Sequence, residues 1–155
     1  MTDDRTKIRR ADRGDIESMA ALLAELFSIE TGFEIDSRKQ KTGLETLLGS
    51  SDILVLVAET DGIVTGMCTV QTVVSTAEGG LSGLLEDMIV KDGYRGQGIG
   101  SRLLTAAEEW AIEMNIFRLQ LLADKTNIPA LDFYLQHGME TTNMICLRKR
   151  YSRSS

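Results

Sequence analysis

Residues 95–101 read Arg-Gly-Gln-Gly-Ile-Gly-Ser and lie between an extended apolar run that ends at Val90 and a helical pattern that continues to about Met114. Alternate glycines allow the backbone to turn sharply and to approach a bulky ligand, because they have no Cβ atom. The N–H groups that open the following helix lack intrahelical partners and lie at the positive end of its dipole, which suits a phosphate or pyrophosphate. The stretch therefore predicts a phosphate-bearing cofactor, with a tight turn that binds no ligand as the alternative.

Two better-known glycine motifs do not fit this stretch. A P-loop has Lys and then Ser or Thr directly after its last glycine, whereas Gly98 is followed by Ile99 and Gly100. The dinucleotide fingerprint has Gly or Ala where this chain has Ser101, and no early βαβ unit precedes the loop. Nucleotide hydrolysis and nicotinamide-dependent oxidoreduction are therefore disfavoured.

The spacing Arg95-x-x-Gly98-x-Gly100 resembles motif A of the GNAT superfamily of acyl-CoA-dependent N-acetyltransferases. Three further features lie at this family's spacing. A strand precedes the loop, Asn127 falls in the next βα junction, and Tyr134 follows seven residues later. Together they are far more specific than the glycines alone, and the resemblance extends over most of the chain.

The resemblance implies an α/β (α+β) fold with a central, mixed, mostly antiparallel twisted sheet of about six to seven strands, flanked by about four helices. A length of 155 residues fits a single domain that needs neither metal nor disulfide support. Asp61-Gly62 is a strong hairpin signal between two of the strands. Residues from about 152 onward are expected to form a disordered tail. Extended segments are expected at residues 7–10, 53–58, 63–74, 84–90, 117–123 and 139–149, and helices near 12–27, before 48, from the glycine loop to 114, and at 128–137.

Acetyl-CoA is the co-substrate that the resemblance implies. Backbone groups of residues 88–90 are expected to pair with its pantetheine arm as an extra strand would, and the N–H groups of residues 96–101 to bind its pyrophosphate. Asn127 is implied to contact the cofactor near the thioester, a role compatible with that of a helix N-cap before Ile128 and Pro129. The expected cofactor-binding residues are Met88, Ile89, Val90, Arg95, Gly96, Gln97, Gly98, Ile99, Gly100, Ser101 and Asn127.

Acyl transfer to an amine requires a group that accepts a proton, because an ammonium has no lone pair. Glu86 and Asp87 lie on the strand before the loop, and alternation along a strand predicts that only one of them points into the acceptor cleft. The surrounding sequence is similar to the diamine and polyamine acetyltransferase branch, which implies Glu86. Its alternative is a carboxylate paired with a basic neighbour. Tyr134 is implied to protonate the departing CoA thiolate, with an aromatic core residue as the alternative.

A net charge of -6 argues against nucleic acid as a partner and is compatible with a small cationic amine as acceptor. A protein or peptide N-acetyltransferase and a non-catalytic acyl-CoA-binding module are the two alternatives. No apolar run suggests a membrane segment. The oligomeric state stays open, although homodimers are common among similar proteins.

Cysteine and histidine usage predicts a metal-free protein of the reducing cytoplasm. Cys68 and Cys146 both lie in apolar, strand-like stretches and are interpreted as small core side chains. His137 is the only histidine, so no zinc-type spacing exists. It precedes Gly138 at the end of a predicted helix and is interpreted as a complement to the helix dipole.

Overall fold

The structure is a computed structural model that describes residues 5–30 and 32–153. The chain divides into two compact units, residues 1–121 and residues 122–155, and each is described by itself. That the chain forms a single domain stays a prediction. No helix within the described ranges is long and apolar enough to cross a membrane.

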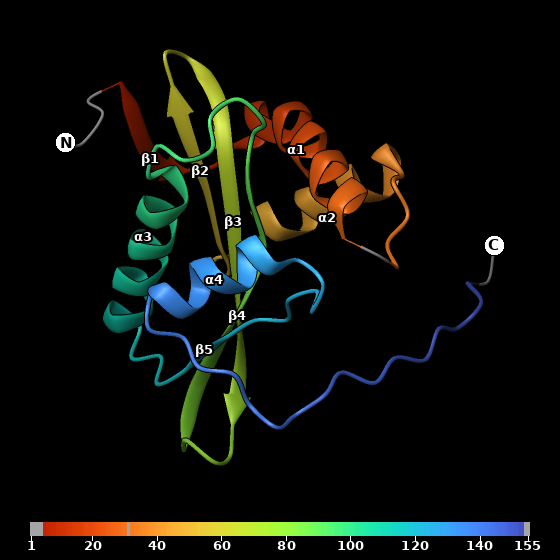
Figure 1. Cartoon of the computed structure of the whole chain (residues 1–155). Helices are drawn as coiled ribbons and strands as arrows, with labels where there is room; N and C mark the ends of the chain where they lie inside the picture. Colours follow the sequence, from red (N-terminus) through yellow and green to blue (C-terminus); the bar gives the residue numbers. More distant parts are fainter. Residues whose placement is uncertain (1–4, 31, 154–155) are drawn as a thin grey trace. The chain divides into compact units, whose positions relative to one another are not determined.

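A five-stranded sheet forms the centre of the first unit (Figure 1). The first four strands pair antiparallel with one another, and only the last pair, formed by the fourth and fifth strands, is parallel. The predicted mixed, mostly antiparallel sheet is therefore confirmed, with fewer strands over the described residues than the expected six to seven. The strands, in spatial and chain order, are β1 Thr6–Arg10, β2 Leu54–Thr60, β3 Ile63–Ser75, β4 Gly80–Val90 and β5 Leu119–Gln120.

Helices cover both faces of this sheet. α1 (Ile16–Ile29) and α2 (Ser37–Leu48) lie on one face, and α3 (Ile99–Glu113) lies on the other (Figure 1). A 3₁₀ turn, η1 (Arg13–Asp15), precedes α1, and Asp12 caps this turn rather than α1 itself. The remaining helix, α4 (Ile128–Gln136), belongs to the second unit. The four predicted α-helices are confirmed.

The core under α1 and α2 follows from the helical spacing of apolar residues in α1. A stripe at this spacing places one face of the helix against the sheet, where burying each large apolar side chain contributes about 1.5–3 kcal/mol. The buried members of this core are Met19, Ala20, Leu22, Leu23 and Leu26 of α1, Leu44 of α2, Val55 and Val57 of β2, Met67 of β3 and Ile89 of β4.

Gly66 of β3 contacts the start of α3 on the opposite face of the sheet. A Cβ atom at this position would lie 3.0 Å from Leu103 Cδ1, 3.2 Å from the Ile89 carbonyl oxygen and 3.3 Å from Ile99 Cγ2. A side chain here would make Leu103, Ile99 and the β4 backbone shift by a few tenths of an ångström, so glycine favours the close approach of the helix and the neighbouring strand. Gly66 thus lets the start of α3 pack closely on β3.

We expect Gly66→Val to lower the free energy of unfolding by about 2–3 kcal/mol, because its methyl groups must displace a helix and a strand backbone. Urea denaturation measures this loss. Gly43→Ala is the matched control, since a Cβ at Gly43 in α2 meets nothing within 4 Å. It should raise stability by about 0.5–1 kcal/mol. A wild-type unfolding midpoint for Gly66→Val would contradict this account.

Three expected extended segments differ from the structure. The strand expected at residues 84–90 already begins at Gly80, within residues interpreted from their glycines as a flexible connection. Gly83 lies inside that strand, where Leu119 packs directly over its backbone. A Cβ at Gly83 would lie 2.6 Å from Leu119 Cδ2, which explains a glycine at this position. Of the predicted strand at 117–123, only Leu119–Gln120 pairs.

The segment at 139–149 was predicted to be a strand and forms no regular structure. Cys146 within it is exposed, so its interpretation as a core residue is wrong, whereas the buried position of Cys68 is confirmed. The reason is that no ladder or apolar layer covers residues 140–153 of the described chain. In the expected tail, Ser152 and Arg153 are exposed and irregular, and residues 154–155 lie outside the described residues.

Candidate active site

The second half of β4 has an open edge. β4 runs from Gly80 to Val90, but the parallel strand β5 pairs with it only at Gly83 and Leu84. Beyond Leu84, β3 is the only strand partner of β4 among the described elements. The backbone of residues 88–90, which was predicted to pair with a pantetheine arm, therefore lies on a strand with one edge available.

A β-bulge interrupts β4 directly before this edge. Thr69 of β3 pairs with Glu86, while Met67 pairs with Ile89, so that two residues of β4 oppose one residue of β3. Asp87 adopts a left-handed backbone conformation, with a φ of 56°. Since cross-strand partners share a face of the sheet, the bulge places Glu86 and Ile89 on the same face, the one that α1 and α2 cover.

The bulge places the carboxylate of Asp87 and the backbone carbonyl of Glu86 at one hydroxyl. Thr69 Oγ1 lies 3.3 Å from Asp87 Oδ2 and 3.3 Å from the Glu86 carbonyl oxygen, and it can donate to either. Alternation requires a regular strand, which the bulge interrupts, so the expectation that only one carboxylate faces the acceptor cleft stays a prediction. Glu86 itself is exposed, while Asp87 is half-buried.

Burial makes the carboxyl group of Asp87 a weaker acid than an ordinary aspartate. Desolvation, together with the nearby charge of Glu86, raises the pKa of Asp87 to about 6, although the hydrogen bond from Thr69 opposes this shift. The site therefore contains an exposed carboxylate beside a carboxyl group that titrates close to neutral pH. Such a pair can accept a proton and can attract a cationic amine.

We expect Asp87→Asn to raise the free energy of unfolding at pH 7.5 by about 1–2 kcal/mol. The folded state binds the proton of Asp87 more tightly than the unfolded state. Wild-type stability should therefore fall as the pH rises from about 4 through 6, and the variant should lose this slope. Urea denaturation at pH 5 and pH 7.5 measures both effects.

Asp61→Asn is the matched control for this variant, because Asp61 also has a positive φ, 50°, but is exposed in a turn. Asn tolerates the left-handed conformation about as well as Asp, so neither substitution adds backbone strain. If Asp87→Asn had a lower free energy of unfolding than wild type at pH 7.5, the ionised carboxylate of Asp87 would not destabilise the folded state, and this account would be wrong.

The loop after β4 is fixed by backbone hydrogen bonds and by glycine conformations. Lys91 N donates to the Thr65 carbonyl at 2.7 Å, and Tyr94 N donates to the Lys91 carbonyl at 3.0 Å. Gly96 and Gly98 have φ values of 77° and 83°, and a Cβ at either position would meet nothing within 4 Å. The backbone conformation, rather than crowding, requires glycine here, and the glycines face open space.

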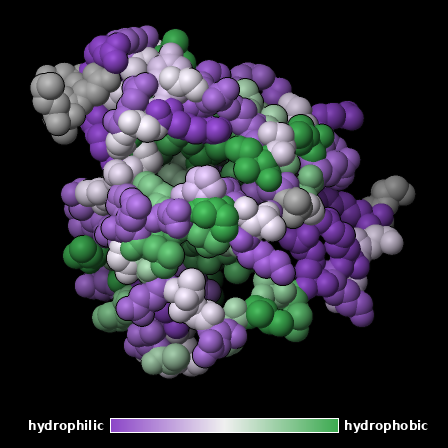
Figure 2. Space-filling model, in the orientation of Figure 1, coloured by the Kyte–Doolittle hydropathy of each residue, from purple (hydrophilic) through white to green (hydrophobic). Residues whose placement is uncertain are grey.

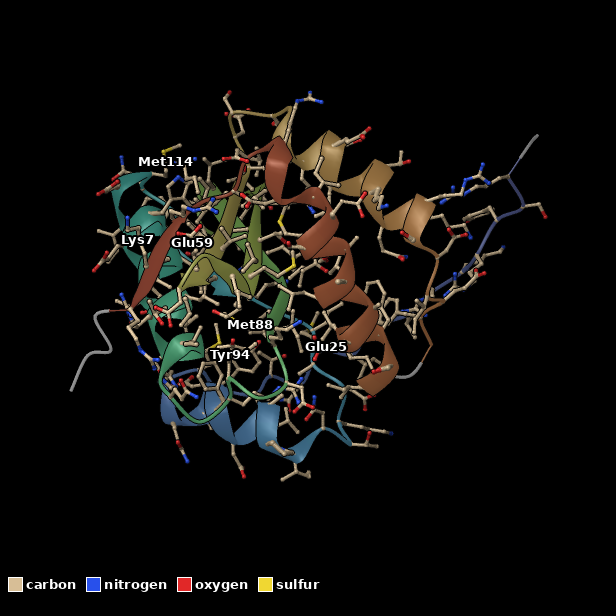
Figure 3. All side chains as sticks on the ribbon, turned by 90° about the horizontal axis from the view of Figure 1, so that it is seen from above. Lys7, Glu25, Glu59, Met88, Tyr94 and Met114 are labelled. Atoms are coloured by element: carbon tan, nitrogen blue, oxygen red, sulfur yellow. The ribbon has the colours of Figure 1, made fainter. Side chains whose placement is uncertain are left out.

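Helix α3 starts at this open space without a side-chain cap. Its N-cap residue is Gly98, which has no side chain to accept from the first turn, and that turn carries no acidic residue. The helix dipole therefore directs partial positive charge toward the loop with no nearby carboxylate in the turn to neutralise it. These residues suit a phosphate group, as the sequence predicts. Figure 3 shows Met88 and Tyr94, from the strand and the loop that precede the helix.

Asn127 and Tyr134 lie in the second unit. Asn127 is the N-cap of α4, with its Oδ1 accepting from Ala130 N at 3.3 Å, so its predicted capping role is confirmed. Tyr134 is half-buried and packs edge-on against Phe133, with ring centroids 5.2 Å apart. His137 donates from Nδ1 to the Phe133 carbonyl at 2.7 Å at the end of the helix, where a structural role was predicted. The structure brings Glu86 and the residues from Met88 to Ser101 together in the first unit, and their meeting with Asn127 and Tyr134 stays a prediction.

Comparison with known proteins shows the family of this chain. The model of the acetyltransferase (GNAT) family matches residues 17–139. An uncharacterized N-acetyltransferase of Archaeoglobus fulgidus is 32% identical over 135 residues, which cover 86% of this chain and 92% of that protein. The aminoalkylphosphonate N-acetyltransferase of Salmonella typhimurium is 27% identical over 137 residues, 88% of this chain and 86% of that protein.

A solved structure of similar fold is a possible acetyltransferase from Clostridium difficile 630. Its TM-score is 0.84 at 20% identity, over 97% of this chain and 100% of that one, which is evidence for the fold alone. The family model and the Archaeoglobus fulgidus relative, rather than the fold, show the class of this protein. The chain belongs to the acetyltransferase (GNAT) family, and it is an N-acetyltransferase of that family.

Proposed function

We propose that the chain transfers an acetyl group from acetyl-CoA to the primary amine of a small, cationic acceptor. The observation that carries this proposal is the pair of neighbouring carboxylates, Glu86 and Asp87, at a bulge that leads into the glycine loop, with Asp87 Oδ2 3.3 Å from Thr69 Oγ1. Negative charge at the end of an open strand edge is suited to an amine that must approach a bound thioester. The net charge of -6 supports the same preference for a cationic acceptor.

The residues that would hold acetyl-CoA are those of the open edge and the loop. The backbone of residues 88–90 offers hydrogen bonds to the pantetheine amides, and the N–H groups of residues 96–101 offer them to the pyrophosphate. Acetyl-CoA supplies a thioester, whose carbonyl carbon accepts the lone pair of the amine. Asn127 would contact this cofactor from its position before α4.

Glu86 and Tyr134 would move the two protons that the reaction requires. Glu86, which is exposed, accepts the proton that the amine must lose before its nitrogen forms the new C–N bond. As the C–S bond breaks, the Tyr134 hydroxyl donates a proton to the thiolate sulfur. Asp87 lies next to Glu86 and would attract the ammonium group before that proton leaves.

A calorimetric titration with acetyl-CoA, followed by a screen for CoA release, tests this function. The screen contains diamines, polyamines, aminoglycosides, aminoalkylphosphonates and peptides with free amino groups. Turnover on small cationic amines but not on peptides is expected. Faster turnover on peptides would favour a peptide N-acetyltransferase, and saturable binding without any turnover would favour a non-catalytic acyl-CoA-binding module.

A further inference from the structure

Glu25, on the α1 face away from the core stripe, contacts the loop that leads to the glycine motif. Its Oε1 accepts a hydrogen bond from the backbone N–H of Asp92 at 3.0 Å. The same oxygen lies 3.6 Å from Nη2 of Arg95. Figure 3 shows Glu25 on α1 beside the loop that carries Tyr94. One carboxylate oxygen of α1 therefore contacts both Asp92 and Arg95, the first and last residues of this segment of the loop.

Arg95 completes this connection. Its Nε donates to the carbonyl oxygen of Val90, the last residue of β4, at 2.8 Å. The guanidinium of the motif thus lies between the strand end and Glu25, and both contacts fold the loop back onto the first unit. The Arg95–Glu25 ion pair is long and its side chains are 45% and 29% exposed, so it contributes little by itself. The shorter bond from the Asp92 backbone carries most of the connection.

We propose that Glu25 is a positioning residue that latches the glycine loop in the conformation that binds CoA. This inference rests on the proposed function of residues 96–101 as the pyrophosphate site. Gly93, Gly96 and Gly98 all have positive φ values, so glycines, which lose more backbone entropy on ordering than other residues, lie on both sides of Arg95. A loop that is held before binding loses less conformational entropy when CoA binds.

Charge alone predicts the opposite effect. Glu25 is an anion near a site for an anionic pyrophosphate, so removing its charge would strengthen CoA binding if Glu25 acted only electrostatically. The latch instead requires an oxygen that reaches Asp92. Glu25→Gln retains a carbonyl oxygen at that reach and loses the charge, whereas Glu25→Ala loses both.

Calorimetric titration of the full chain with CoA distinguishes these cases. We expect Glu25→Ala to raise the Kd by about tenfold, equivalent to about 1.4 kcal/mol, and Glu25→Gln to stay within about threefold of wild type. Glu25→Asp, which keeps the charge but shortens the reach, should weaken binding like Glu25→Ala. This variant keeps the test decisive if Glu25→Ala does not fold.

Glu17→Ala is the matched control, because Glu17 also lies on α1 and pairs with Lys41 at 2.8 Å. Its Kd should equal that of wild type. Hydrogen exchange gives a second readout, since the Asp92 amide should exchange faster in Glu25→Ala and Glu25→Asp but not in Glu25→Gln or Glu17→Ala.

Two results would overturn the latch without affecting the proposed function. Unchanged CoA affinity in Glu25→Ala and Glu25→Asp, with normal binding by wild type, would remove the latch and leave the proposed function intact. Tighter binding by both Glu25→Ala and Glu25→Gln would show that the charge, not the hydrogen bond, is what matters. Failure of wild-type protein to bind CoA would be a separate result, which removes the proposed function and the latch with it.

Discussion

Replacement of Glu86 by Gln is expected to lower kcat for acetyl transfer by about 100-fold near pH 7, with the Kd for acetyl-CoA nearly unchanged. Gln has the shape of Glu but accepts no proton, so the amine must reach the site already deprotonated. Amines with a pKa near that of Lys are rarely deprotonated at pH 7. The deficit should therefore shrink as the pH rises toward the pKa of the acceptor.

A steady-state pH profile of kcat between pH 6.5 and 10 measures this effect. Glu78→Gln is the control, because Glu78 lies in the turn of the same hairpin and pairs with Arg118 at 3.5 Å. Tyr134→Phe should behave differently, since a lost acid slows the release of the thiolate and is not rescued by high pH. Wild-type turnover in Glu86→Gln at pH 7 would remove Glu86 as the proton acceptor.

Features that depend on a few neighbouring residues could be predicted from the sequence. Asp61 and Gly62 form the expected hairpin turn, with φ values of 50° and 81°. The apolar stripe of α1 and the glycines before α3 were likewise visible, because helical spacing and positive φ leave local signatures. These local features determine most of the fold and the loop of the candidate site.

Features that depend on distant segments could not be predicted in the same way. Asp87 occupies a bulge because of its pairing with β3, and nothing in Leu85-Glu86-Asp87-Met88 indicates a positive φ. The role of Gly66 requires knowing that α3 starts above it. Glu25 resembled an ordinary polar residue of an amphipathic helix until its contact with Asp92, far along the chain, was known.

The extent of the sheet also depends on distant segments. Alternating or apolar residues at 117–123 and 139–149 predict strands, but a strand also needs a neighbour with unpaired backbone groups in register. Leu119 and Gln120 find such a neighbour in Gly83 and Leu84. Because β5 is short, the later residues of β4 keep the free edge on which the proposed cofactor site depends.

Gly98→Val is expected to weaken acetyl-CoA binding by at least about 100-fold, to the point where calorimetry detects none. Gly98 has a φ of 83° and precedes the first turn of α3. A β-branched residue disfavours this conformation by about 1–3 kcal/mol, so the loop would rearrange and its N–H groups would turn away from the ligand. Any valine that kept the conformation would place methyl groups in the proposed pyrophosphate site.

Gly62→Val separates the loss of binding from the cost of backbone strain. Gly62 has a nearly equal φ of 81°, a Cβ there also meets nothing within 4 Å, and it lies in an exposed turn away from the loop. Both variants should lose similar free energy of unfolding in urea, but only Gly98→Val should lose binding. Equal binding by Gly98→Val and wild type would mean that the open space beside the glycines is not the pyrophosphate site, and that the loop serves only as the turn into α3.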